Sequence, residues 1–476
     1  MKHKLSAFSD FANKLYPHEA DYLLSINRFV KSSNREILLT IHHNCHHPEN
    51  IRSFDESLDK RTYSYVKNWI TESLEKADVD KFYAWLLSIE KQVMLDAISP
   101  EEEREIIAYF KVILPSHYYF LRFYELVQHF RDYLLIRVRN IFYKPTNQYL
   151  QQYEKAYQTG LAVNKQLNNA TVEIIRQHEN PQADSSVFKT FLNTTFFDQN
   201  LDGYTRYRAA VRLTFLYYNY REFENLRMLY DALDEEFKSE TFYSKRLLSN
   251  YYSNRAMMHS KLNELNRAEH YGFLSIKQKN SDYLFYLANL CGVLLRNKKY
   301  EKALRVMSQS IPDLKHTNSF YNKIGFVSFY IKTLIYNNKA KNAVSYATTF
   351  LEAYRKEIFD TRWHLFFTAY LQALLTAEKY EKVTGLTKRY NLIGLEKKFI
   401  DSTVYLPVLQ WYHEVALFIE GRQSKENLIE TIVNSAVGLL SHSYKAGRVF
   451  ELLDVIYDFV PEETAEIKNR LSKLAI

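Results

Sequence analysis

Residues 287–311, LANLCGVLLRNKKYEKALRVMSQSI, contain the pattern that decides the fold. Leucines recur at helical spacing up to a short polar turn, Asn-Lys-Lys-Tyr, and a second helical segment then opens around Ala303. Apolar residues repeating every three or four positions are typical of a helix with one buried face. Two such segments joined by a short turn predict a helical hairpin.

The same design recurs along the chain. When the related fragments are aligned on the first small or apolar residue of the second helix, the intervals are 42, 35, 40 and 40 residues. A unit of fixed design in this length range indicates helical hairpins stacked into a solenoid. The aligned residues are Leu226, Ala268, Ala303, Ala343 and Val383.

This pattern resembles the tetratricopeptide repeat family over about residues 205–395. In that family small or apolar residues mark the close approach of the two helices, and an aromatic residue fills the turn between hairpins. Leu290 and Cys291 match the first packing position, Tyr300 the aromatic one and Ala303 the start of the second helix. The resemblance implies an α-solenoid, a superhelix of antiparallel hairpins. A non-repetitive helical bundle is the alternative.

Composition supports an all-α fold. The 476 residues include only 10 Gly and 9 Pro, whereas strands joined by tight turns need more of both. Hydrophobic residues make up 46% of the chain and aromatic residues 16%, which is enough to build a core and excludes a disordered chain.

We predict two regions. Residues 1–180 form an N-terminal α-helical region, and residues 187–476 form the TPR-like solenoid with its C-terminal capping helices. The loop-like stretch 178–186 marks the seam. Within the first region, Ser99 followed by a proline and three glutamates predicts a helix start, and Pro145 predicts a helix break.

Charge and cysteine content limit the class of partner and the cellular compartment that we expect. The net charge of +8 comes from interleaved basic and acidic residues, which argues against nucleic acid as the partner. The two cysteines, Cys45 and Cys291, exclude a disulfide framework and favour a reducing compartment. No apolar core of a signal peptide stands near the N-terminus, and no segment is long and apolar enough to span a membrane. We therefore expect a cytoplasmic protein.

One histidine-rich stretch, IHHNCHHPE at 41–49, offers candidate metal ligands. His42, Cys45 and His46 share one helix face, and thiolate and imidazole are the ligands of zinc sites. No second pair of ligands at matching spacing appears elsewhere in the sequence. We therefore predict neither a metal site nor a cofactor.

Catalytic signatures are absent apart from one weak pair. Arg122 and His129 are spaced like the Arg-x4–6-His pair of helical HEPN-type ribonucleases, in which the histidine acts as base and the arginine steadies the phosphate. No phosphate-binding glycine loop and no nucleophile elbow occurs. We predict that the chain is not an enzyme and has no catalytic residues, and the ribonuclease stays the second alternative.

By elimination we predict an interaction scaffold that holds a protein or an acidic or mixed-charge peptide on the concave face of the repeats. An alternative is a regulator whose N-terminal helices read nucleic acid or a signal through the basic, hydroxyl-rich segment 58–69. If the family register holds, the concave face carries these residues: Arg208, Tyr218, Asn219, Asn250, Met257, Lys261, Arg296, Lys332, Tyr336 and Gln372.

Overall fold

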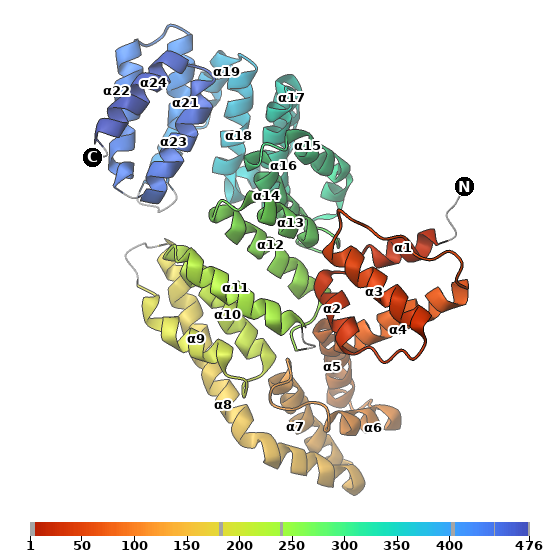
Figure 1. Ribbon diagram of the computed structural model, residues 1–476. Helices are drawn as coiled ribbons and strands as arrows, with labels where there is room; N and C mark the ends of the chain where they lie inside the picture. The colour runs from red at the N-terminus through yellow and green to blue at the C-terminus, as the bar shows by residue number, and fades with distance from the viewer. Residues whose placement is uncertain (1–4, 180–183, 239–240, 401–404, 442, 475–476) are drawn as a thin grey trace. The chain divides into compact units, whose positions relative to one another are not determined.

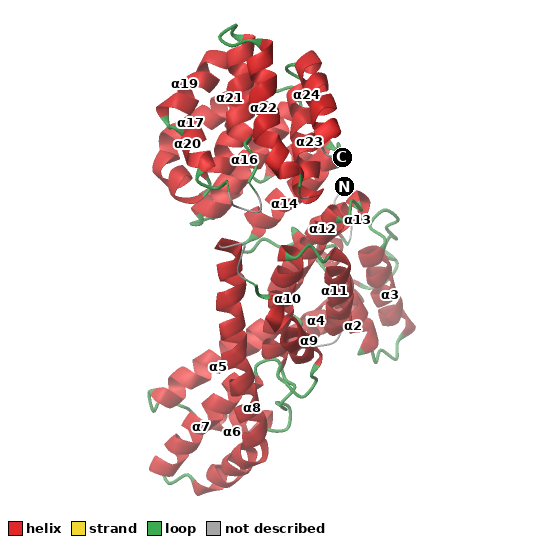
Figure 2. Cartoon of the chain, turned by 90° about the vertical axis from the view of Figure 1, so that its left-hand side faces the viewer, coloured by secondary structure: helices red, strands yellow, loops and turns green. Residues whose placement is uncertain are grey.

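The computed structural model describes residues 5–179, 184–238, 241–400, 405–441 and 443–474, and within these ranges every regular element is a helix (Figures 1 and 2). The predicted all-α class is confirmed. Among the described residues, no helix is both long enough and apolar enough to cross a membrane.

The chain forms two compact units, residues 1–262 and residues 263–476. The boundary lies in the turn that follows Lys261, and therefore inside the stretch for which the repeat is predicted. The predicted seam at 178–186 lies within the first unit, and residues 180–183 of it are outside the described residues.

The helices of the first unit are α1 (Ser6–Ala12), α2 (Pro17–Ser25), α3 (Ser32–His46), α4 (Lys60–Ala77), α5 (Val79–Met94), α6 (Pro100–Tyr109), α7 (Phe120–Ile136), α8 (Asn140–Glu179), the 3-10 helix η1 (Ser186–Phe188), α9 (Lys189–Phe197), α10 (Gly203–Asn219), α11 (Phe223–Lys238) and α12 (Lys245–Lys261).

The helices of the second unit are α13 (Leu265–Ser275), α14 (Tyr283–Arg296), α15 (Tyr300–Gln309), the 3-10 helix η2 (Ile311–His316), α16 (Phe320–Tyr336), α17 (Ala340–Thr361), α18 (Trp363–Thr376), α19 (Tyr380–Arg389), α20 (Leu392–Lys397), α21 (Val408–Ile419), α22 (Lys425–Leu440), α23 (Ser443–Tyr457) and α24 (Pro461–Leu474).

One turn geometry recurs between consecutive helices. Its central residue has a φ between 52° and 68°, the left-handed region, although only one of these residues is glycine. In most of these turns the next amide donates to the carbonyl five residues before it, as Lys299 does to Leu294 at 2.9 Å. This bond satisfies a carbonyl at the helix end and sends the chain back antiparallel. The central residues are Asp96, Val138, Arg221, Asn263, Lys298, Asn338, Glu378 and Gly421.

In the second unit the hairpins follow one another in a regular order. The first helices pack in succession, with α14 against α16, α16 against α18 and α18 against α21 (Figure 1). Each first helix also packs on its own second helix, as α14 does on α15, α16 on α17 and α18 on α19. A single core therefore runs through consecutive hairpins.

The residues that the repeat alignment brings into register share one environment. All five are buried, with Leu226 at 3% exposure and the others at 0%. Tyr300, predicted to fill the turn between hairpins, stacks on Tyr336 at the end of the next first helix, with ring centroids 5.1 Å apart. The five aligned positions are therefore buried, as expected of residues that pack between helices.

The first unit contains the same hairpin geometry where the sequence shows no repeat. Helices α5 and α6 are joined through Asp96, and α7 and α8 through Val138. As the first helices do in the second unit, α5 packs on α7; in addition, α6 packs on α8. The sequence does not show this similarity because the helix lengths vary, from 10 residues in α6 to 40 in α8.

Local predictions in this region have mixed outcomes. The start at Ser99 is confirmed, since its hydroxyl accepts from the amide of Glu102 while the Glu102 carboxylate accepts from the amide of Ser99. The break at Pro145 is wrong, because α8 continues through it. The proline stands six residues into the helix, where its missing amide costs a single bond near the helix start.

The left-handed turns give a stability prediction. Val138 is 73% exposed and has φ 56°, a conformation that costs a residue with a Cβ roughly 1–2 kcal/mol. We expect Val138→Gly to raise the free energy of unfolding by about 1 kcal/mol. Val172, also exposed but inside α8, is the matched control, and Val172→Gly should lower it by about 0.5 kcal/mol. Thermal denaturation of both variants measures this, and equal effects at the two valines would contradict the strained turn.

Candidate functional site

Four predicted groove residues belong to the second unit, and three of them come together. Lys332 and Tyr336 lie one turn apart on α16, and Gln372 of α18 lies close enough to Tyr336 to act to lower its pKa. Arg296 is exposed at the end of α14. Counted from the left-handed residue of its hairpin, Arg296 stands at the same position as Tyr336, and Lys332 at the same position as Gln372.

Residues near the C-terminus affect the charge of two of these predicted groove residues, Lys332 and Tyr336. The pKa of Lys332 is lowered to about 8, chiefly by burial and then by the charge of Arg448 on α23. The pKa of Tyr336 is raised, first by burial, and the carboxylate of Asp458 adds to the rise. Arg448 and Asp458 therefore lie close to the face that carries Lys332 and Tyr336.

The other six predicted groove residues lie in the first unit, where only some come together. The ammonium of Lys261 lies 5.7 Å from the ring centroid of Tyr218, so this pair joins α12 to α10. Asn250 accepts a hydrogen bond from Asn254, one turn along the same helix. Asn219 and Met257 are half-buried and lie near the ends of α10 and α12.

Arg208 is already engaged within the unit. Its guanidinium donates to the side-chain oxygens of Asn164 and Asn168 on α8, the latter at 2.6 Å. Arg212, one turn further along α10, donates to Thr171 of α8 at 2.6 Å. The long helix α8 therefore contacts α10 around Arg208, one of the residues that the sequence assigned to the groove.

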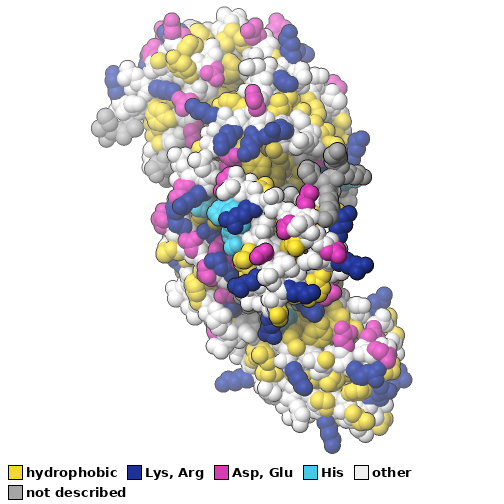
Figure 3. All heavy atoms as spheres, turned by 45° about the vertical axis from the view of Figure 1, so that its right-hand side comes forward, with side chains coloured by type: hydrophobic (Ala, Val, Ile, Leu, Met, Phe, Trp, Pro, Cys, Tyr) yellow, Lys and Arg dark blue, Asp and Glu magenta, His cyan; other side chains and the backbone are white. Residues whose placement is uncertain are grey.

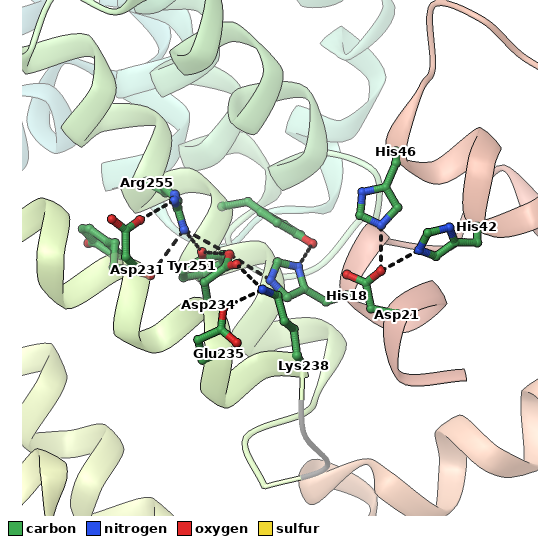
Figure 4. Close-up of polar contacts among 12 residues, drawn as sticks. His18, Asp21, His42, His46, Asp231, Asp234, Glu235, Lys238, Tyr251 and Arg255 are labelled. Carbon is green, nitrogen blue, oxygen red and sulfur yellow. Dashed lines mark hydrogen bonds and ion pairs between the residues drawn. The ribbon is translucent and has the colours of Figure 1, made fainter. Parts of the chain in front are cut away.

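The histidine-rich stretch ends α3, and Figure 3 shows histidine side chains gathered at one place on the surface. His42, Cys45 and His46 are predicted to share one helix face. The thiol of Cys45 is instead buried, at 5% exposure, and donates to the Leu15 carbonyl at 3.5 Å. His42 and His46 both turn instead to Asp21 of α2 (Figure 4). No sequence signal connects Asp21 with this stretch.

The ribonuclease pair has acidic neighbours. Arg122 and His129 lie two turns apart on α7 and both face Glu90 of α5, at 3.7 and 3.8 Å. Arg122 also donates to Glu125 at 2.5 Å. Carboxylates therefore stand where a phosphate would have to bind, and their charge repels a phosphate.

The segment proposed to read nucleic acid forms the start of α4. Asp59 caps this helix by accepting from the amide of Arg61 at 2.9 Å. Tyr65 and Lys67 are exposed, and the ring of Trp69 packs on that of Phe29 with centroids 4.6 Å apart. The connection from α3 to α4 runs from residue 47 to residue 59, much longer than the turn of a helix-turn-helix motif.

A buried polar network in the first unit has no counterpart in the sequence analysis. Glu19 of α2 is completely buried and accepts from the Tyr16 amide at 2.8 Å and from the Tyr243 hydroxyl at 2.6 Å. The Tyr16 hydroxyl is hydrogen bonded to Ser249 of α12 at 2.9 Å. These contacts join residues more than 200 positions apart, which is why local patterns do not reveal them.

The same helix carries a second buried contact, to α11. His18 lies 3.1 Å from Asp234 through Nε2 and 2.6 Å from the Tyr252 hydroxyl through Nδ1 (Figure 4). Tyr251 and Arg255 also donate to Asp234, at 2.5 and 3.0 Å. Burial acts to raise the pKa of Asp234, but these partners outweigh it and hold the pKa below its ordinary value. Asp234 is therefore a charged anchor for α2.

The buried network gives a prediction about how α2 is held. We expect Glu19→Gln to lower the free energy of unfolding of the first unit by about 1–3 kcal/mol, because the two bonds go to different carboxylate oxygens and glutamine has an NH2 group, which cannot accept, in place of one of them. Glu36→Gln on the exposed face of α3 is the control and should change it little. Thermal denaturation of the two variants gives the comparison. An unchanged melting curve for Glu19→Gln would show that the carboxylate does not hold α2 in place.

Comparison with known proteins adds no assignment. No family model matches the chain, and no curated protein and no solved structure matches it.

Proposed function

We propose that the chain is a non-enzymatic binding scaffold, a TPR-like α-solenoid that holds a protein or peptide partner. The observation that carries this proposal is the succession of α14, α16 and α18, each followed by the same left-handed turn. Helices repeated in one orientation present equivalent positions side by side, as in solenoids that bind extended partners. The proposed site on this unit is the set Arg296, Lys332, Tyr336 and Gln372, called the inner face below.

The chemistry of the inner face favours an acidic peptide. The charge of Arg448 helps to lower the pKa of Lys332, although Arg448 also pairs with Glu451 at 3.3 Å. A carboxylate of a bound peptide would offset this repulsion and raise the pKa of Lys332 toward its ordinary value. The aromatic ring of Tyr336 and the amide of Gln372 add a flat surface and hydrogen-bonding atoms.

Two further features fit this proposal. Both cysteines are buried as thiols and neither is part of a disulfide, which supports a reducing compartment such as the cytoplasm. Cys291 is hydrogen bonded to Thr333 at 3.1 Å, and burial raises the pKa of its thiol to about 12. A thiol held in this protonated state serves packing and not nucleophilic chemistry.

Selection of peptides tests the proposed site. We expect a random peptide library displayed on phage to yield acidic sequences that bind the protein. Arg296→Glu combined with Lys332→Gln should weaken a selected peptide by roughly tenfold or more, because two cations are lost. Arg305→Glu, an exposed charge reversal on α15 of the same hairpin, is the matched control. Equal binding to the double variant and to the control would remove the inner face as the site.

The lowered pKa of Lys332 predicts a pH dependence. The ammonium is charged below its pKa of about 8 and neutral above it, so acidic peptide affinity should fall as pH rises through about 8. The fall should be roughly tenfold, the effect of losing one charge-assisted hydrogen bond. Lys332→Arg stays charged throughout this range and should abolish the pH dependence. Fluorescence anisotropy of a labelled peptide at pH 7 and 9 provides the measurement, and a pH dependence that persists in Lys332→Arg would contradict the role of this lysine.

The alternatives have weaker support. A nucleic-acid or signal-binding role of the N-terminal helices rests on the exposed basic residues of α4, while the long connection before this helix departs from a helix-turn-helix. A ribonuclease would require Arg122 and His129 to bind phosphate beside Glu90. The inner face also has a carboxylate nearby, that of Asp458, but the cations Arg296, Lys332 and Arg448 outnumber it.

A further inference from the structure

Two histidines and an aspartate converge on one point in the first unit. The Nε2 atoms of His42 and His46 each lie 2.8 Å from the same oxygen, Oδ1 of Asp21 (Figure 4). Candidate ligand atoms of the three residues all lie within 4.8 Å of one another. The three side chains are between 25% and 35% exposed, so the cluster is partly enclosed but reachable from solvent.

Rigid elements hold this arrangement. His42 and His46 are separated by one helical turn on α3, and their ring centroids lie 4.5 Å apart. Asp21 projects from α2, which packs against α3. Sites whose groups stand on helices keep their geometry better than sites on loops. His18 and Glu19, on the same helix, fix α2 through their buried contacts to residues 234–252.

Two imidazoles and one carboxylate are a recognised ligand set. Zinc sites with an open position use two histidines and a carboxylate, and ferrous sites use the same combination. We propose that Asp21, His42 and His46 bind a divalent transition-metal ion, with a further position open to water. Bonds of about 2.0–2.2 Å in tetrahedral geometry place ligand atoms roughly 3.3–3.5 Å apart, so each nitrogen–oxygen distance would lengthen by only about half an ångström.

The electrostatics of the cluster suit a cation. Burial acts to raise the pKa of Asp21, but its hydrogen bonds and charge interactions with His46 and His42 outweigh burial and leave the pKa below its ordinary value. The carboxylate is therefore ionised at neutral pH. A metal ion would take the place of the protons that the two imidazoles share with it.

The neighbouring histidines lack such an arrangement. His43 donates to the Asn50 carbonyl at 2.9 Å, and His47 lies 3.6 Å from Glu49. Their rings are close, at 4.8 Å between centroids, but the two contacts do not meet on a common ligand atom. This pair therefore has the same spacing along the chain without the shared carboxylate, and it serves as a matched control.

Calorimetric titration of the full-length protein with Zn²⁺ at pH 7.5 tests the site. We expect one equivalent of Zn²⁺ to bind. His42→Ala or His46→Ala should weaken binding by more than about 100-fold, which is more than the loss of a residue that only hydrogen-bonds to a metal ligand would cause. Asp21→Asn should weaken it by at least about tenfold, and His43→Ala combined with His47→Ala by less than about twofold. Affinity should also fall in acid, because protons compete with the metal ion for the ligand atoms.

Two outcomes would overturn the proposal. One is no saturable Zn²⁺ binding to the wild-type protein. The other is binding that survives His42→Ala and His46→Ala or that depends on His43 and His47 instead. Circular dichroism checks that each variant is folded. If a variant is not, zinc-edge X-ray absorption of the wild-type protein decides the matter, since a first shell without two imidazole nitrogens would exclude this site.

Discussion

The hydrogen bond that closes the first helix of each hairpin is the constraint on which the rest of the structure depends. It runs from the amide after the left-handed residue to a carbonyl five residues earlier, as from Lys339 to Leu334 at 2.9 Å. The bond fixes where the helix ends and the direction in which the second helix leaves. Lys332 and Gln372 occupy equivalent positions because each stands the same number of residues before the left-handed residue of its own turn.

The first unit adds a different constraint, because its N-terminal helices are held by residues far along the chain. Besides the contacts of α2, the amide of Val79 donates to the Tyr243 carbonyl at 2.9 Å, and Arg246 forms a bidentate pair with Asp80. Buried charges such as Glu19 are tolerated only where partners satisfy them. Residues 1–180 and residues 200–262 therefore stabilise each other.

Only part of the candidate inner face could be predicted from the sequence. Tyr336 of α16 and Gln372 of α18 lie near each other because these two helices pack side by side, whereas the groove assignment as a whole stays a prediction. Arg208 instead forms hydrogen bonds with α8. The sequence also did not predict that Arg448 and Asp458 lie near Lys332 and Tyr336. A repeat pattern describes neighbours within the repeat, and it contains no information about helices that pack onto it from outside.

The sequence by itself determined that the chain is helical, where the helix at Ser99 begins and which small residues are buried, because these depend on spacing along a few turns. Only the tertiary structure decided that α8 continues through Pro145, that Cys45 faces the core and that His42 and His46 meet Asp21. These outcomes depend on side chains brought together by packing between helices. Local periodicity predicts which face of a helix is buried, but it does not predict which residues of other helices pack against that face.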